Sequence, residues 1–132
     1  MSALSFTVTK TFACGMAALF SALTDAKSIK NWSGQKGKIP LKVGGKLNLF
    51  DGWVTGVVLQ VEQPSGITFT WIPSDWTVKI ESVVSYSLSE KNGKTKIMIS
   101  HSGIPDEAQM QSHKTGWKEY VLEPVEAHLK SL

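Results

Sequence analysis

The sequence predicts an α+β fold in which a curved antiparallel sheet of about six strands wraps around a long C-terminal helix, with two short helices after the first strand. Three observations predict it. The chain begins with alternating apolar and polar residues, hairpin signals follow one another between Lys46 and His101, and the last segment has helical periodicity. The apolar stripe of that last helix must be buried, and the sheet offers the only large apolar face. We therefore expect the helix to lie against the sheet.

Length and composition predict one domain, covering residues 1–132. Hydrophobic residues make up 42% of the chain, which is enough for a single well-filled core. The net charge is +3, and all fourteen cations are lysines. Without arginine the chain lacks the bidentate side chain that most often reads guanine and grips phosphate, so we expect no nucleic-acid partner.

The single Cys14 excludes an internal disulfide and is compatible with a reducing compartment. No apolar run approaches the ~18 residues needed to span a bilayer. The apolar segment from Phe12 to Leu23 is explained more simply by an amphipathic helix than by a signal peptide. We therefore expect a cytoplasmic protein without a membrane span.

In the first third of the chain, the spacing of apolar residues changes from alternation to helical periodicity. Alternating apolar and polar residues predict a strand over residues 3–11. Apolar side chains then follow at helical spacing, at Met16, Leu19, Phe20 and Leu23. Thr24-Asp25 can cap a second short helical turn, and the Gly- and Lys-rich segment 33–46 predicts a loop.

Five further strands are predicted in the middle of the chain. The turns between them contain Asp51-Gly52, Pro64-Ser65-Gly66, Pro73-Ser74-Asp75 and Asn92-Gly93. The predicted strands cover residues 46–50, 53–62, 67–71, 77–90 and 95–101. Consecutive hairpins of this kind are typical of an antiparallel meander.

The last segment predicts a long helix that begins at Pro105, a residue suited to the first helical position. Pro124 is expected to kink it, because proline removes a backbone hydrogen bond. At 100° per residue, one inward stripe contains Met110, His113, Trp117, Val121, Pro124 and His128. A sheet that curls around one long helix often leaves space between them, which predicts a ligand cavity there.

Several phrases of the sequence resemble a known family. Ala22-Leu23-Thr24-Asp25, followed by Ile29 and Trp32, resembles the early helical signature of START-like, helix-grip proteins. The segment VGGKLNLFDGWVTG at 43–56 resembles the strand-turn-strand signature of homologues of the heat-shock protein 90 ATPase activator. Further matching phrases are Trp71 with Trp76, His101-Ser102-Gly103-Ile104-Pro105, and Gly116-Trp117 with Tyr120. Together they span about residues 5–128 in the family's order.

The resemblance implies a helix-grip fold of the START-like, birch-pollen-allergen type. It is to the activator's C-terminal domain and to short proteins that consist of that domain alone. The activator's separate N-terminal domain, which grips the chaperone, has no room in 132 residues, so a stand-alone, single-domain member is implied. The wider superfamily binds hydrophobic small molecules such as lipids, sterols and polyketides, and a few members are cyclases or hydrolases.

These observations favour a non-enzymatic binding domain that holds a small hydrophobic molecule between the sheet and the C-terminal helix, as a monomer or weak homodimer. The alternative is a co-chaperone-like module that contacts the heat-shock protein 90 chaperone. A small-molecule cyclase or hydrolase is less favoured. The activator-like branch has no common catalytic residues, so none is assigned. No cofactor is expected, and no metal, because no Cys or His has the spacing of a third ligand.

Two histidines are the most informative polar residues. His101 and His113 fall on inward faces, where they either contact a ligand's head group, act as acid and base, or satisfy backbone groups. Five tryptophans exceed the usual need of a core this small. Trp76 is either part of a cavity wall or an exposed anchor for a protein partner. The predicted cavity residues are Phe50, Trp53, Trp71, Trp76, Tyr86, His101, Met110, His113, Trp117 and Tyr120.

Two lysine-containing segments have simpler interpretations. The basic loop with Lys36, Lys38, Lys42 and Lys46 is either a solvated face or a contact for an acidic partner surface. Gly93-Lys94-Thr95 ends like a phosphate-binding loop, but Leu88 stands where that loop requires glycine. No nucleotide site is therefore predicted.

Overall fold

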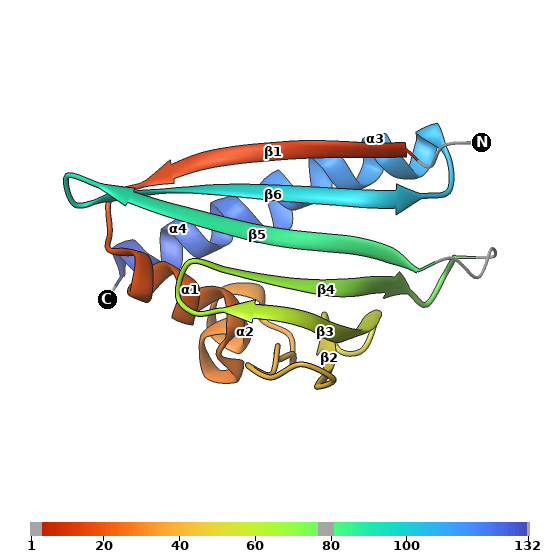
Figure 1. Cartoon of the computed structure of the whole chain (residues 1–132), viewed down its shortest axis with the longest axis horizontal. Coiled ribbons are helices and arrows are strands. Elements are labelled where there is room, and N and C mark those ends of the chain that lie inside the picture. The colour runs from red at the N-terminus through yellow and green to blue at the C-terminus, as the bar shows by residue number, and fades with distance from the viewer. Residues whose placement is uncertain (1–3, 77–80, 132) are drawn as a thin grey trace.

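The computed structural model describes residues 4–76 and 81–131. A six-stranded antiparallel sheet forms one layer, with the strands in the order β1-β6-β5-β4-β3-β2 (Figure 1). The strands are β1 (Leu4–Phe12), β2 (Lys46–Leu49), β3 (Val54–Glu62), β4 (Gly66–Pro73), β5 (Ser82–Lys91) and β6 (Lys94–Ile104). The predicted fold class is confirmed. The pairing of β1 with β6, which the sequence pattern did not specify, places Phe6 opposite His101.

Side-chain alternation decides which face of the sheet is buried. In β6, Ile97, Ile99 and His101 are fully buried, whereas Met98 between them is 41% exposed. The buried residues of the central strands pack against the helices and form one hydrophobic cluster. The predicted strand 77–90 is observed from Ser82 onward, and residues 77–80 of that prediction lie outside the described residues.

The turn between β2 and β3 corrects the sequence interpretation. A two-residue turn at Asp51-Gly52 was predicted, but the strands end at Leu49 and resume at Val54. Phe50, Asp51 and Gly52 all have positive φ, at 56°, 57° and 87°, which breaks the pleat over the whole connection. Phe50 and Trp53 are therefore turn residues rather than strand residues, and their ring centroids lie 6.2 Å apart.

The helices lie on one face of the sheet (Figure 1). After β1 come α1 (Met16–Thr24) and α2 (Ala26–Ser33), and Asp25 caps α2 as predicted, since its carboxylate accepts the Ser28 N–H at 3.1 Å. The C-terminal helix consists of α3 (Glu107–Gly116), a π-helical turn η1 (Trp117–Leu122) and α4 (Glu123–Lys130). Among the helices of residues 4–76 and 81–131, none is long and apolar enough to cross a membrane.

The π-helical turn changes which residues of the C-terminal helix are buried. Pro124 cannot donate a backbone hydrogen bond and would collide with the preceding turn of an α-helix. The chain widens into η1 just before it, and the Glu123 N–H bonds to the carbonyl of Lys118, five residues back. The predicted stripe ended at Pro124 and His128, but these two are only half-buried. Val125 is fully buried in their place.

Candidate functional site

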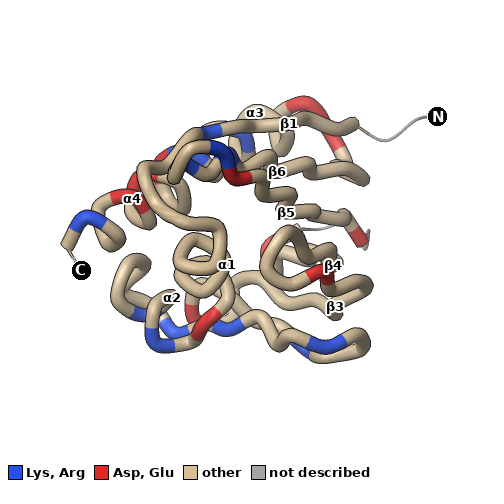
Figure 2. Tube along the Cα trace, turned by 60° about the vertical axis from the view of Figure 1, so that its left-hand side comes forward, with Lys and Arg blue, Asp and Glu red and all other residues tan. Residues whose placement is uncertain are grey.

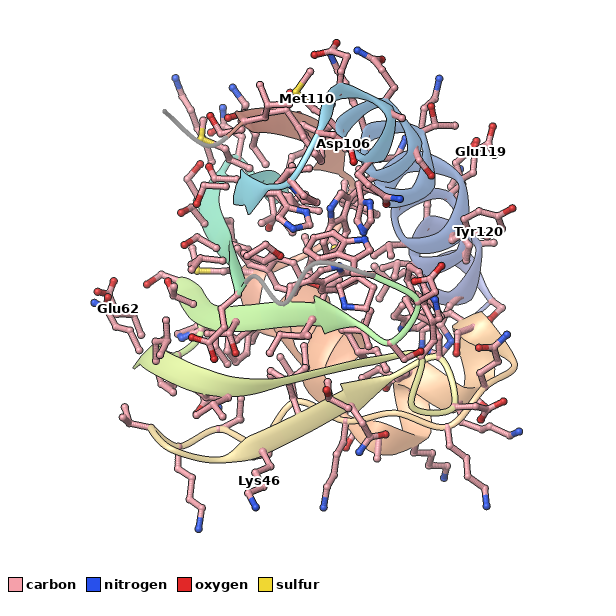
Figure 3. All side chains as sticks on the ribbon, turned by 90° about the vertical axis from the view of Figure 1, so that its right-hand side faces the viewer. Lys46, Glu62, Asp106, Met110, Glu119 and Tyr120 are labelled. Atoms are coloured by element: carbon pink, nitrogen blue, oxygen red, sulfur yellow. The ribbon has the colours of Figure 1, made fainter. Side chains whose placement is uncertain are left out.

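A pocket of about 600 Å³ opens between the C-terminal helix and the strand ends that face it. Four parts of the chain build it: the end of α2, the β2–β3 turn, the end of β4 and the inner side of α3 and η1. Six aromatic residues line it, namely Trp32, Phe50, Trp53, Trp71, Trp117 and Tyr120. Figure 3 shows side chains filling the space between the sheet and this helix, with Glu119 on its outer side. Tyr120 lines the pocket at its edge and is 66% exposed.

The aromatic wall is continuous, because neighbouring rings touch, three pairs edge to face and the Trp71–Trp117 pair at a tilt of 42°. Trp32 packs against Phe50 at 6.5 Å between centroids, and Phe50 in turn packs against Trp53. Trp53 then meets Trp71 at 6.4 Å, and Trp71 meets Trp117 at 4.8 Å. Such ring pairs add to the stability of a wall beyond the apolar area they bury, so the wall is a preformed surface.

His113 also lines the pocket and is held by two opposite contacts. Its Nδ1 lies 3.0 Å from the carbonyl oxygen of Gln109, which can only accept, so Nδ1 carries the proton. Its Nε2 is then an acceptor and takes the indole N–H of Trp71 at 3.1 Å. His113 is buried and also stacks on Trp53, with 6.1 Å between ring centroids.

His101 lies deeper and takes the other tautomer. Its Nδ1 accepts the indole N–H of Trp117 at 3.1 Å, so the proton sits on Nε2. That N–H is donated to Ser82 Oγ at 3.0 Å, and the Ser82 hydroxyl is donated to the backbone carbonyl of Trp71. His101 and Ser82 are both fully buried, so this chain of hydrogen bonds is shielded from water.

Both imidazoles are neutral at physiological pH. Burial, with the nearby His113 as the second cause, lowers the pKa of His101 to about 3. Burial also lowers the pKa of His113, although the hydrogen bond to Gln109 and the negative charge of Asp75 act against it. All four ring nitrogens are used in hydrogen bonds within the protein. Every buried side-chain nitrogen or oxygen in the described part of the chain has a partner.

The structure brings six of the ten predicted cavity residues to the pocket: Phe50, Trp53, Trp71, His113, Trp117 and Tyr120. Tyr86 and His101 are buried behind the wall, and Met110 is half-buried but does not line the pocket. Trp76 is half-buried, with its indole N–H donated to the side chain of Gln109 at 3.0 Å.

Sequence reasoning missed Trp32, Asp75 and Gln109 as pocket residues. Trp32 follows Ile29 at helical spacing, and its indole N–H bonds to the Ala22 carbonyl at 2.7 Å, which leaves its ring at the pocket. Asp75 was read only as a turn residue. Within the described residues, no cluster of three or more His, Cys, Asp or Glu side chains is placed to hold a metal ion.

A meandering sheet covered on one face by a C-terminal helix, with a pocket between the two layers, defines a helix-grip, START-like protein. The family described as "Activator of Hsp90 ATPase homolog 1-like protein" matches residues 14–130. The chain therefore belongs to this family, and the resemblance seen in the sequence is confirmed.

Curated relatives agree with this assignment. The mouse "Activator of 90 kDa heat shock protein ATPase homolog 1" is 23% identical over 119 residues, which are 90% of this chain and 35% of the relative. The Dictyostelium discoideum activator homologue is 32% identical over 84 residues, 62% of this chain and 21% of its own length. The chain thus spans about a third or less of the curated relatives it matches.

Solved structures match over nearly the whole chain. An HSP90 activator from Plasmodium falciparum has a TM-score of 0.88 and 30% identity, and the match covers 96% of both chains. CalU16 from Micromonospora echinospora has a TM-score of 0.83 and 24% identity, over 96% of this chain and 74% of that one. At that identity the second match shows the fold alone.

Proposed function

We propose that the chain is a non-enzymatic binding domain that holds a small hydrophobic molecule in the pocket between the sheet and the C-terminal helix. The observation that carries the proposal is the aromatic lining of a pocket of about 600 Å³. This volume lies within the usual range for small-molecule sites. Each apolar Å² that a ligand removes from water contributes roughly 25 cal/mol, so such a wall supplies binding energy without requiring a charged anchor.

The histidines support binding rather than catalysis. An acid or base must reach its substrate with a free lone pair or proton near neutral pH. His113 and His101 instead spend both ring nitrogens on protein partners, and burial keeps both imidazoles neutral. Their role in the proposal is to fix the positions of Trp71 and Trp117, whose rings line the pocket.

A dye titration with a blocking variant tests the binding function. An environment-sensitive apolar dye should bind saturably and change the tryptophan fluorescence of the wild-type protein. Ser112 is exposed on α3 and lines the pocket, so Ser112→Phe should fill the pocket and abolish the signal. Thr115→Phe places the same ring on the same helix outside the pocket lining and should leave binding unchanged. Equal dye binding by both variants would contradict the proposal.

The family relationship supports a second candidate, a co-chaperone-like module that contacts the heat-shock protein 90 chaperone. The relatives named above are called activators of that ATPase. This chain also carries one exposed basic edge made by Lys27, Lys30, Lys36, Lys38, Lys42 and Lys46. Figure 2 shows lysines on α2 and along the chain near it, with acidic residues interspersed. No Asp or Glu occurs between Lys27 and Lys46, so an acidic protein surface is the complementary partner.

A pull-down with purified heat-shock protein 90, combined with an ATPase assay, tests the second candidate. The triple variant K36E/K38E/K42E reverses the basic edge and should weaken both capture and any stimulation. The control K91E/K94E/K96E reverses three exposed lysines at the β5–β6 turn and should have little effect. No capture by the wild-type chain, or equal losses in both variants, would contradict a contact through this edge.

A further inference from the structure

The charge of the pocket lining is opposite in sign to the net charge of the chain. The chain carries a net charge of +3. Among the described residues that line the pocket, however, the only charged side chain is Asp75. The single ion pair within the described residues joins Lys10 and Glu126, so no described lysine neutralises Asp75. A ligand in the pocket therefore meets one negative charge and no described positive one.

The wall offers π faces rather than hydrogen-bond donors. All four tryptophans of the lining have already donated their indole N–H within the protein. Trp32 and Trp53 donate to oxygen acceptors, the Ala22 carbonyl and the Asp75 carboxylate. His113 likewise has no free ring nitrogen. An anionic head group needs cations or several converging donors. The described lining holds no cation, and its remaining donors are the neutral side chains of Gln35, Gln109, Ser112 and Tyr120.

At the rim, a carboxylate and an exposed ring are fixed side by side. The Trp53 indole N–H is donated to Asp75 Oδ1 at 3.1 Å, and Trp53 is 38% exposed. The face of an indole carries negative electrostatic potential and attracts a cation within about 6 Å of the ring centroid. The negative charge of Asp75 acts in the same direction, and its field reaches far enough inward to oppose the lowering of the pKa of His113.

We infer that the pocket selects an amphiphilic organic cation, that is, a protonated or quaternary amine attached to a flat aromatic or apolar body. The apolar body packs against the ring wall, and the amine lies at the rim, against the face of the Trp53 ring and beside the Asp75 carboxylate. This inference rests on the proposed binding function and adds the charge of the ligand to it. Fatty acids and other anionic amphiphiles are the class that the pocket disfavours.

Three probes with one body and different head groups test the inference. They are 4-phenylbutyltrimethylammonium, 4-phenylbutan-1-ol and 4-phenylbutanoate, titrated separately into the wild-type protein and followed by tryptophan fluorescence and calorimetry. We expect the cation to bind about fivefold to tenfold more tightly than the alcohol, which corresponds to a cation–π contribution at a partly desolvated site. The anion should bind most weakly.

Matched variants assign the preference to the rim. Asp75→Asn removes the charge but keeps an amide oxygen that can accept the Trp53 N–H, so the turn should stay folded. It should weaken cation binding about twofold to fivefold and leave alcohol binding unchanged. Glu62→Gln removes one negative charge from β3, away from the pocket lining, and should change neither (Figure 3 labels Glu62).

The possible failures are distinguishable. If the alcohol and the acid bind as tightly as the cation, or if Asp75→Asn leaves the cation's affinity unchanged, the charge preference is wrong while the binding function stands. If none of the three probes binds saturably, the binding function itself is overturned, and the inference falls with it.

Discussion

Two tryptophans of the same pocket wall are held in opposite ways. Trp117 is 2% exposed and donates its indole N–H to His101, a neutral imidazole that is itself fully buried. Trp53 is 38% exposed and donates to the carboxylate of Asp75. A buried charge is costly unless it is paired, so the inner end of the wall uses neutral partners only. The rim can keep a charge because water reaches it, and that charge is available to a ligand.

The comparison predicts that the inner end determines stability and the rim contributes little to it. Trp117→Ala should give the largest loss, about 3–5 kcal/mol in the free energy of unfolding, because it opens a cavity and strands the acceptor on His101. Urea unfolding followed by circular dichroism measures this. Tyr120→Ala on the same helix, where the ring is 66% exposed, should change stability by no more than about 0.5 kcal/mol. Similar losses of unfolding free energy in both variants would contradict the prediction that the inner end determines stability.

Lowering the pH should destabilise the folded protein mainly through His101, at the inner end of the wall. The pKa of His101 is lowered to about 3 in the folded state, well below the ordinary value of 6.5. Above pH 6.5 neither state binds the proton. As the pH falls from 6.5 toward 3, the unfolded chain binds the proton and the folded chain does not, so stability decreases. The slope approaches 1.4 kcal/mol per pH unit, or about 2–3 kcal/mol between pH 6.5 and 4.5.

The variant His101→Phe separates this contribution from that of the carboxylates. Stability measured against pH should fall less steeply below pH 6.5 in the variant than in the wild type. Parallel curves would show that His101 already binds a proton in the folded state, which is incompatible with its hydrogen bond from Trp117.

At neutral pH the same variant measures the hydrogen bond. His101→Phe leaves the buried indole N–H of Trp117 without an acceptor, which should cost about 2 kcal/mol. Combining it with Trp117→Phe removes the donor as well, so the double variant should lose less stability than the two single changes added together. Strict additivity in urea unfolding would mean that the two residues are not coupled.

A change at the rim should affect stability less than a change at the inner end and should act mainly on binding. Trp53→Ala should lower the free energy of unfolding by about 1 kcal/mol, because the ring is only partly buried. The same change should weaken binding of the apolar dye several-fold, since it removes the centre of the aromatic wall. A dye affinity equal to that of the wild type would place the ligand elsewhere.

Burial of the two histidines was predictable from the sequence, whereas at the rim the aromatic residues Phe50 and Trp53 were predicted but the turn that positions them was not. Period-two and helical patterns put His101 and His113 on inward faces, and these patterns report burial directly. They do not report partners, so the pairing of β1 with β6 and the two indole–imidazole hydrogen bonds appeared only in the structure. One expectation was that both histidines satisfy backbone groups. His113 does so directly, at the carbonyl of Gln109, whereas His101 reaches the carbonyl of Trp71 only through Ser82.

The rim depends on backbone geometry that residue patterns do not encode. Phe50 has a φ of 56°, which is an uncommon conformation for an aromatic residue. The turn signals of the sequence did not predict a positive φ at this position. A strand over residues 46–50 would have placed Phe50 and Trp53 on separate strands, and the observed turn brings their rings together. Asp75 likewise became a pocket residue only because β4 ends beside the helix.

The π-helical turn divides the C-terminal helix into two halves with separate alignments. In an uninterrupted α-helix of 3.6 residues per turn, Trp117 and Val125 would point about 80° apart, yet both are buried. The π-helical turn η1 contains one extra residue, which brings Trp117 and Val125 back to the same side of the helix. The residues of α3, which line the pocket, can therefore change without rotating α4, which packs against α1 and α2. Such a break in the helix lets the sequence of the pocket-lining segment vary while the segment that packs against the short helices keeps its orientation.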